Sequence, residues 1–123
     1  MENKALILVV DDSPTQALCM RRLLQGCFDV MTVANGKLAL AAIHEKVPDL
    51  VVTDLHMPEM DGLELVEALR EEHPALPIVL TTSQGSEEIA WQALRRGASS
   101  YVPKRHLRKE LLPTVARFVS MLS

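Results

Sequence analysis

The stretch Asp49-Leu-Val-Val-Thr-Asp54-Leu-His-Met-Pro58-Glu-Met-Asp61-Gly62 decides the fold. It begins with an apolar, β-branched run at residues 50–53, which is typical of a strand buried on both faces of a sheet. Pro58 and Gly62 follow, and they predict a turn that no strand continues through. Asp54 therefore lies where a buried strand ends in a loop. In an open parallel sheet, ligands bind at this end of a strand, although an aspartate in a loop also commonly caps a helix.

The length and composition of the chain limit the classes of protein it can belong to. It has 123 residues, of which 48% are hydrophobic, and a formal net charge of -3. These values predict one folded domain over residues 1–123 and argue against nucleic acid as a direct partner. No apolar run approaches the ~20 residues that span a membrane, and the N-terminus has no secretory signal. We therefore expect a cytoplasmic protein without a membrane segment.

Strand-like and helix-like segments alternate five times along the chain. The predicted strands cover residues 6–10, 29–33, 50–53, 78–82 and 99–102. The predicted helices run from Pro14 to about Gly26, over residues 38–45, from Gly62 to His73, between Ser86 and Gly97, and over residues 107–122. This alternation predicts an α/β fold, a doubly wound, flavodoxin-like parallel sheet of five strands with five helices on its two faces. The predicted strand order is 2-1-3-4-5.

Details within the helices give further expectations. The fourth helix should turn Ile89, Ala90, Ala93 and Leu94 inward, and this leaves Trp91 off the inner row. Pro113 lies inside the last helix, which should be kinked or interrupted there. If Cys19 and Cys27 both lay on the first helix, they would be ~12 Å apart, too far for a disulfide. We therefore expect two free thiols.

The predicted strand order brings polar residues together at one edge of the sheet. Strands 1 and 3 are neighbours in this order, so Asp11 and Asp12 should lie beside Asp54. Three close carboxylates repel one another, and Mg²⁺ relieves such repulsion because it prefers oxygen ligands. Thr82 ends the fourth strand and Lys104 follows the fifth. A carboxylate, a metal ion, a hydroxyl and an ammonium together are suited to phosphoryl transfer.

Each of these residues also has an ordinary structural explanation. The two adjacent aspartates can cap the first helix, Thr82 suits any strand, and Lys104 can be a solvated surface residue. Their coincidence at the C-terminal ends of the strands favours a functional site.

The motifs at this edge resemble those of the response-regulator receiver family of bacterial two-component signalling. The resemblance covers essentially the whole chain and is carried by residues 11–13, 54–62, 77–82 and 97–104. It implies that Asp54 is the phosphoacceptor and that Asp11, Asp12 and Asp54 hold Mg²⁺. The backbone carbonyl of His56 would be a further metal ligand.

The resemblance also implies roles for residues around this acidic group. Thr82 would be the switch hydroxyl, Lys104 would contact a phosphoryl oxygen or the unmodified carboxylate, and Tyr101 would be the aromatic that reports activation. His56 and Gln84 match positions that tune the lifetime of the phosphoryl group.

Departures from the family pattern affect the lysine loop. Arg105 stands where the family usually has proline, so the Lys104–Arg105 peptide should be trans and the ammonium could be placed differently.

The same resemblance implies the partners. The phosphoryl donor would be a sensor histidine kinase or a histidine phosphotransfer protein. A downstream protein or a second copy of the chain would bind the surface formed by helix 4, strand 5 and helix 5. The chain as given would be a single receiver domain with no output domain, and a stand-alone receiver, a phosphorelay shuttle and a piece of a larger regulator all remain open. It would not be an enzyme apart from its own phosphorylation and dephosphorylation.

Two alternative functions remain open on the sequence alone. One is a receiver-shaped interaction module that is never phosphorylated. The other is an aspartate-nucleophile phosphatase of the haloacid dehalogenase type, which needs a second aspartate two positions after the nucleophile and a larger chain. His56 occupies that position here, so the phosphatase is the weaker alternative.

Overall fold

The computed structural model describes residues 4–83 and 87–121, and it has the predicted architecture. Five parallel strands form one sheet in the order β2-β1-β3-β4-β5. The strands are β1 (Leu6–Val10), β2 (Asp29–Val33), β3 (Leu50–Asp54), β4 (Ile78–Thr82) and β5 (Ser100–Pro103). The helices are α1 (Pro14–Leu24), α2 (Gly36–Glu45), α3 (Gly62–Glu72), α4 (Glu87–Arg95) and α5 (Leu107–Ser120), with a 3-10 turn, η1, at Lys104–His106. The fold prediction is confirmed.

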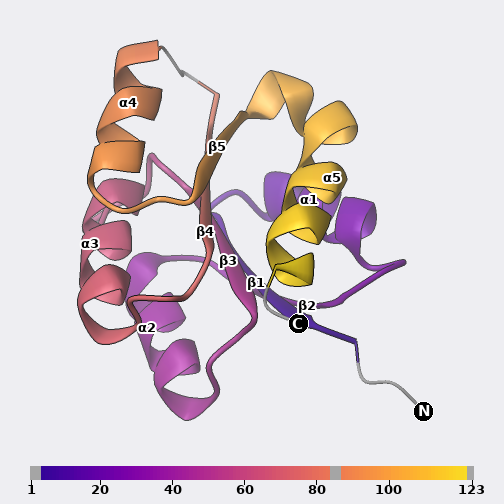
Figure 1. The fold of residues 1–123 in the computed structure, drawn as a ribbon, viewed down its shortest axis with the longest axis horizontal. Helices are drawn as coiled ribbons and strands as arrows, with labels where there is room; N and C mark the ends of the chain where they lie inside the picture. The colour runs from indigo at the N-terminus through magenta and orange to yellow at the C-terminus, as the bar shows by residue number, and fades with distance from the viewer. Residues whose placement is uncertain (1–3, 84–86, 122–123) are drawn as a thin grey trace.

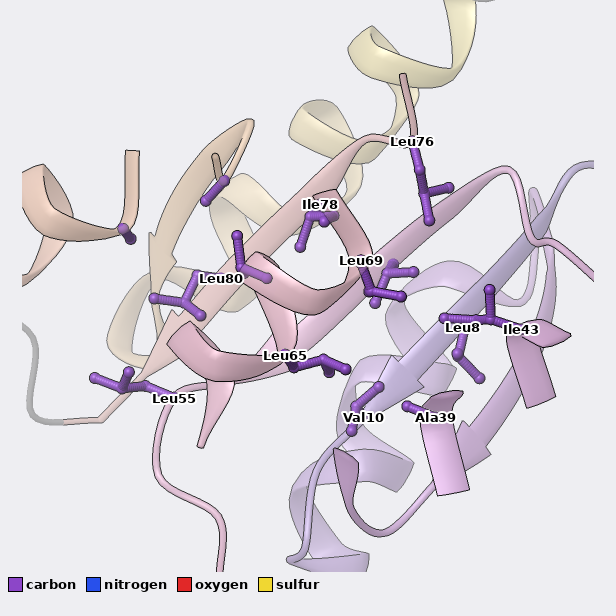
Figure 2. Packing of buried hydrophobic residues seen from close by; sticks show 14 of the residues in the cluster. Leu8, Val10, Ala39, Ile43, Leu55, Leu65, Leu69, Leu76, Ile78 and Leu80 are labelled. Atoms are coloured by element: carbon purple, nitrogen blue, oxygen red, sulfur yellow. The ribbon is translucent and has the colours of Figure 1, made fainter. Parts of the chain in front are cut away.

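Alternate residues of the central strands face opposite sides of the sheet and build two apolar cores. Helices α2, α3 and α4 cover one face, while α1 and α5 cover the other (Figure 1). Figure 2 shows part of the first core, where Leu8 and Ile78 from the sheet lie near Leu65 and Leu69 of α3. The second core is formed mainly by the alternate strand residues together with residues of α1 and α5. Every residue of β3 and β4 is buried, as expected for the middle of a covered parallel sheet.

Capping residues fix where the helices begin at the functional edge. The Ser13 hydroxyl accepts a hydrogen bond from the Gln16 amide, and Pro14 occupies the first turn of α1. Asp61 and Glu64 form a reciprocal capping box at the start of α3. Helix α2 begins two residues earlier than predicted because the Asn35 side chain caps it by accepting from the Leu38 amide. These caps hold the first turns of three helices in fixed positions.

One expectation about the helices was wrong, and a second was excluded only in part. Leu94 is 45% exposed instead of facing inward, and Ala93 is the buried residue of α4. Successive helical residues are rotated by about 100° because each turn holds 3.6 residues, so a face centred on Ala93 leaves its neighbour in solvent. Helix α5 also continues through Pro113 without interruption. The proline is exposed, and its buried neighbours Leu111, Thr114 and Val115 anchor the helix on both sides of it. A kink at Pro113 stays a prediction.

Several smaller expectations were tested as well. Both cysteines are free and exposed, but Cys27 follows α1 instead of lying on it. The described residues contain no cis peptide bond, so the Lys104–Arg105 peptide is trans as predicted. Within residues 4–83 and 87–121, none of the helices is both long enough and apolar enough to cross a membrane.

Candidate functional site

The three aspartates predicted to meet at the sheet edge do lie together. Asp11 follows β1 directly and Asp54 is the last residue of the adjacent strand β3. One carboxylate oxygen from each of Asp11, Asp12 and Asp54 lies within 4.8 Å of the others. Asp11 and Asp54 are buried, whereas Asp12 is exposed. The group therefore has two carboxylates in the protein interior and one open to solvent.

Lys104 reaches into this acidic group from the turn that follows β5. Its Nζ atom lies 2.9 Å from Oδ2 of Asp11 and 3.1 Å from Oδ1 of Asp54. The ammonium also donates a hydrogen bond to Oε1 of Gln16 in the first turn of α1. The Lys104 side chain is only 10% exposed. Arg105, which follows the lysine where the family usually has proline, therefore does not prevent the Lys104 ammonium from reaching the site.

The electrostatics of the site leave an excess of negative charge at Asp54. Burial raises the pKa of the Asp54 carboxyl, and the Lys104 ammonium opposes that effect. The neighbouring carboxylates of Asp11 and, less strongly, Asp12 raise the pKa further. One ammonium does not neutralise three carboxylates, so the site attracts an additional cation. Because all three side-chain donors are carboxylate oxygens, the set suits a hard divalent ion such as Mg²⁺.

Local hydrogen bonds orient the buried carboxylate of Asp11. Its Oδ1 atom accepts from the backbone amide of Ser13 at 2.9 Å, and its own amide donates to the Val33 carbonyl of β2 at 3.1 Å. Its second oxygen accepts from Lys104. Asp11 is therefore held by the loop into α1, by β2 and by the lysine turn together.

The two threonines at the end of β4 have different surroundings. Thr81 pairs in register with Asp54, and its hydroxyl donates to the Thr53 carbonyl at 3.4 Å. Thr82 is also buried and follows at the very end of the strand. Its position next to β3 agrees with a switch hydroxyl, and that role stays a prediction.

Tyr101 lies on β5 opposite Leu80 and packs against the first core. Its hydroxyl is buried and has no hydrogen-bond partner among the described residues. Burial raises the pKa of this hydroxyl, while the charge of Arg105 lowers it. Leu80, Tyr101 and Thr82 share one face of the sheet, because register partners point the same way and so do residues two apart. The predicted switch pair is therefore on the face that α4 covers.

His56 is exposed in the loop after β3, so its side chain is accessible to water near the site. The proposed metal bond of its backbone carbonyl stays a prediction. Gln84 and the expected helix cap Ser86 lie outside the described residues.

Sequence reasoning missed two residues that organise the site and its surroundings. Gln16 contacts Lys104, and only its place in the first turn after the Ser13 cap could have indicated this. The Arg70 guanidinium donates to backbone carbonyls of Gly97, Pro74 and Leu76 at 2.6 to 3.0 Å. It thereby joins α3 to the loop before β4 and to the turn after α4. No sequence signal identifies such acceptors, because every residue has a carbonyl.

Comparisons with known proteins show which family the chain is similar to. The family model of the response regulator receiver domain matches residues 7–116. The DNA-binding transcriptional regulator NtrC of Salmonella typhimurium is 34% identical over 118 residues, which are 95% of this chain and 25% of NtrC. The transcriptional regulatory protein ZraR of the same organism is 39% identical over 105 residues, or 85% of this chain and 24% of ZraR. The chain thus spans about a quarter of the length of these two relatives.

Solved structures show the same similarity. The receiver domain of the Francisella response regulator 1452 superposes with a TM-score of 0.90 at 26% identity, covering 97% of this chain and 99% of that one. The BeF3-activated DrrB receiver domain gives a TM-score of 0.88 at 28% identity, covering 95% and 98% of the two chains. With the family model matching most of its length, this chain belongs to the response regulator receiver family.

Proposed function

We propose that this receiver domain accepts a phosphoryl group on Asp54 from a phosphohistidine. The donor would be a sensor histidine kinase or a histidine phosphotransfer protein. The observation that carries the proposal is the Lys104 ammonium 3.1 Å from Asp54, inside a group of three carboxylates whose oxygens lie within 4.8 Å. Arrangements of this kind stabilise charge on a transferring phosphoryl group.

Each residue of the group has a proposed part in this reaction. Asp11, Asp12, Asp54 and the backbone carbonyl of His56 would hold Mg²⁺. When bound, Mg²⁺ supplies positive charge that offsets the charge on the phosphoryl oxygens. The Asp54 carboxylate forms a bond to phosphorus as the phosphorus–nitrogen bond of phosphohistidine breaks, and the imidazole leaves with the electron pair of that bond. Lys104 provides a fixed positive charge for a phosphoryl oxygen.

The response to phosphorylation would pass to the surface formed by α4, β5 and α5. The new phosphoryl group attracts the Thr82 hydroxyl, and Tyr101 fills the space behind it. A local electrostatic change of this type can bias a packing arrangement that has two states. The surface carries exposed apolar side chains, Trp91 at 63% and Leu94 at 45%. The partner of this surface would be a downstream protein or a second copy of this chain, not nucleic acid. The receiver domain would act in the cytoplasm.

Mass spectrometry of the intact chain tests the phosphoacceptor directly. With acetyl phosphate and Mg²⁺, the wild-type chain should gain one phosphoryl group, and EDTA should prevent the gain. Asp54→Asn should abolish it. Asp29→Asn, which changes an exposed aspartate at the start of β2, should leave it unaltered. Asp12→Ala should raise the Mg²⁺ concentration that phosphorylation needs, because it removes a ligand of the metal ion.

The same experiment separates the alternatives. Labelling that persists in Asp54→Asn would show that the acceptor is wrongly assigned. A wild-type chain that gains no phosphoryl group would instead support an interaction module that is never phosphorylated. Continuous hydrolysis of a phosphomonoester would support the phosphatase.

A further inference from the structure

We propose that Gln16 is a positioning residue for phosphoryl transfer, which holds the Lys104 ammonium at the site through its side-chain carbonyl. This inference rests on the proposed phosphorylation of Asp54. It starts from the contact between Gln16 Oε1 and Lys104 Nζ, which joins the first turn of α1 to η1 across 88 positions of the sequence.

The hydrogen-bond capacity of the ammonium is the first argument. A lysine ammonium has three N–H donors and no acceptor. Lys104 faces three acceptors, which are Oδ2 of Asp11, Oδ1 of Asp54 and Oε1 of Gln16. Since its side chain is 10% exposed, little water is available to replace a lost acceptor. Removing the Gln16 carbonyl therefore leaves one donor of a nearly buried charge without a protein partner.

The three acceptors differ in what the reaction does to them. Asp11 would also bind the metal ion, and Asp54 would become an acyl phosphate, in which the negative charge lies on the phosphoryl oxygens instead of the carboxylate. Both of these interactions with Lys104 therefore weaken or rearrange during the reaction. Gln16 neither reacts nor carries charge for a metal ion, so its carbonyl is the acceptor that can stay with Lys104 throughout.

The local structure of α1 fixes Gln16 in a suitable place. Its backbone amide donates to the Ser13 hydroxyl at 3.3 Å, and Pro14 begins the same helical turn. The side chain is partly buried and reaches Lys104 directly. Because the residue is a neutral amide, it adds an acceptor without adding a fourth negative charge that would compete with Asp54 for the ammonium.

The main variant is Gln16→Met, which keeps the length of the side chain and removes the acceptor. Its matched control is Gln25→Met, the same exchange at an exposed position just after α1. In the wild-type background, Gln16→Met should slow phosphorylation by acetyl phosphate with Mg²⁺ about tenfold, the rate effect of losing one hydrogen bond to a charged group. Gln25→Met should phosphorylate at the wild-type rate.

A second background tests whether Gln16 acts through Lys104. In Lys104→Ala, the further change Gln16→Met should alter the rate by less than about twofold, because residues that act as a unit are not additive. In the metal-free chain, the Lys104 ammonium should give an NMR signal protected from exchange with water. That signal should be lost in Gln16→Met and kept in Gln25→Met.

The outcomes that overturn the inference are distinct from a failure of the proposed function. A Gln16→Met variant that labels at the wild-type rate, or is slowed equally in both backgrounds, excludes the positioning role. If Gln16→Met does not fold, Gln16→Asn serves instead, because asparagine is equally polar but its side chain is one methylene too short to reach the Lys104 ammonium. A wild-type chain that is never labelled on Asp54 refutes the proposed function itself.

Discussion

A β-carbon on Gly62 would lie 2.4 Å from the backbone carbonyl oxygen of Asp54. It would also lie 2.8 Å from the α-carbon of Leu55. The Gly62 amide donates to the Leu55 carbonyl at 2.8 Å, so the start of α3 rests directly on the end of β3. The backbone that presents Asp54 is therefore held in place by a residue that has no side chain.

The first prediction concerns Gly62→Ala. Alanine favours a helix over glycine by about 1 kcal/mol, but here its methyl group overlaps backbone atoms that no rotamer change can move. The variant should lose about 1–3 kcal/mol of unfolding free energy, measured by urea denaturation. In Gly26→Ala, the new methyl group meets nothing within 4 Å. That control should stay within about 0.5 kcal/mol of the wild type, and a Gly62→Ala variant of equal stability would contradict the argument.

The parts of the fold predicted most closely were the buried strands. The bounds of β1, β2 and β4 agree with the prediction because apolar runs end abruptly at charged residues, turns or prolines. The acidic group was predictable for a topological reason. Once the strand order is 2-1-3-4-5, the ends of β1 and β3 must be neighbours, so Asp11 has to lie beside Asp54.

The parts that could not be predicted depend on how side chains are oriented in three dimensions. The exposure of Leu94 follows from the rotation at which α4 rests on the sheet, and a nine-residue helix has too few apolar positions to fix that rotation. The contact between Gln16 and Lys104 depends on side chains from opposite ends of the chain. The hydrogen bonds of Arg70 go to backbone carbonyls, which leave no trace in the sequence.

A second prediction follows from the raised pKa of Asp54. Burial disfavours the ionised carboxylate, so the pKa of the Asp54 carboxyl is higher in the folded chain than in the unfolded chain. The protonated carboxyl therefore contributes fully to stability at a pH below its pKa in the unfolded chain. That contribution is lost as the pH rises through its raised pKa in the folded chain. Without Mg²⁺, Asp54→Asn should therefore have a higher Tm than the wild type at pH 7 to 8. The gain should disappear below about pH 4, where the carboxyl is protonated in both states.

Added Mg²⁺ provides the control for this experiment. It should raise the Tm of the wild type more than that of Asp54→Asn, because a ligand stabilises the folded state more when it binds that state more tightly. A variant that is less stable than the wild type at neutral pH would show that the ion pair with Lys104 outweighs the burial of Asp54.

A third prediction concerns Arg70, whose burial lowers the pKa of its guanidinium. Its hydrogen bonds hold Gly97, which has a φ of 117° and ends the α4 segment. Arg70→Met should cost about 2–4 kcal/mol, since hydrogen bonds from charged donors contribute more than neutral ones. The control is Arg96→Met, which removes a pair with Glu67 that is exposed on both sides. That change should cost at most about 1 kcal/mol, and equal losses in urea denaturation would contradict the proposed role of Arg70.

The last prediction tests the α4–β5–α5 surface through Trp91. Helix α4 buries only Ala93 among its residues, so little packing energy opposes a shift of this helix. Tyr101 beside it has a buried hydroxyl without a partner in the described part of the chain, which favours a second arrangement. A differential of about 5.5 kcal/mol would carry a two-state equilibrium from 1:99 to 99:1. Beryllofluoride with Mg²⁺, a mimic of the phosphoryl group, should therefore change the fluorescence of Trp91, which is 63% exposed on α4.

The connection from the acidic group to Trp91 should depend on Thr82. Thr82→Ala removes the hydroxyl that would move toward the phosphoryl group, so it should reduce the fluorescence response while leaving the mimic bound at Asp54. The control Thr32→Ala changes a threonine on the edge strand β2, three strands away from β4–β5 in the order β2-β1-β3-β4-β5, and should respond as the wild type does. NMR chemical shifts give an independent measurement over the whole chain. If the shifts caused by the mimic gather on α1 and α2 and leave α4 unchanged, the signalling surface lies elsewhere.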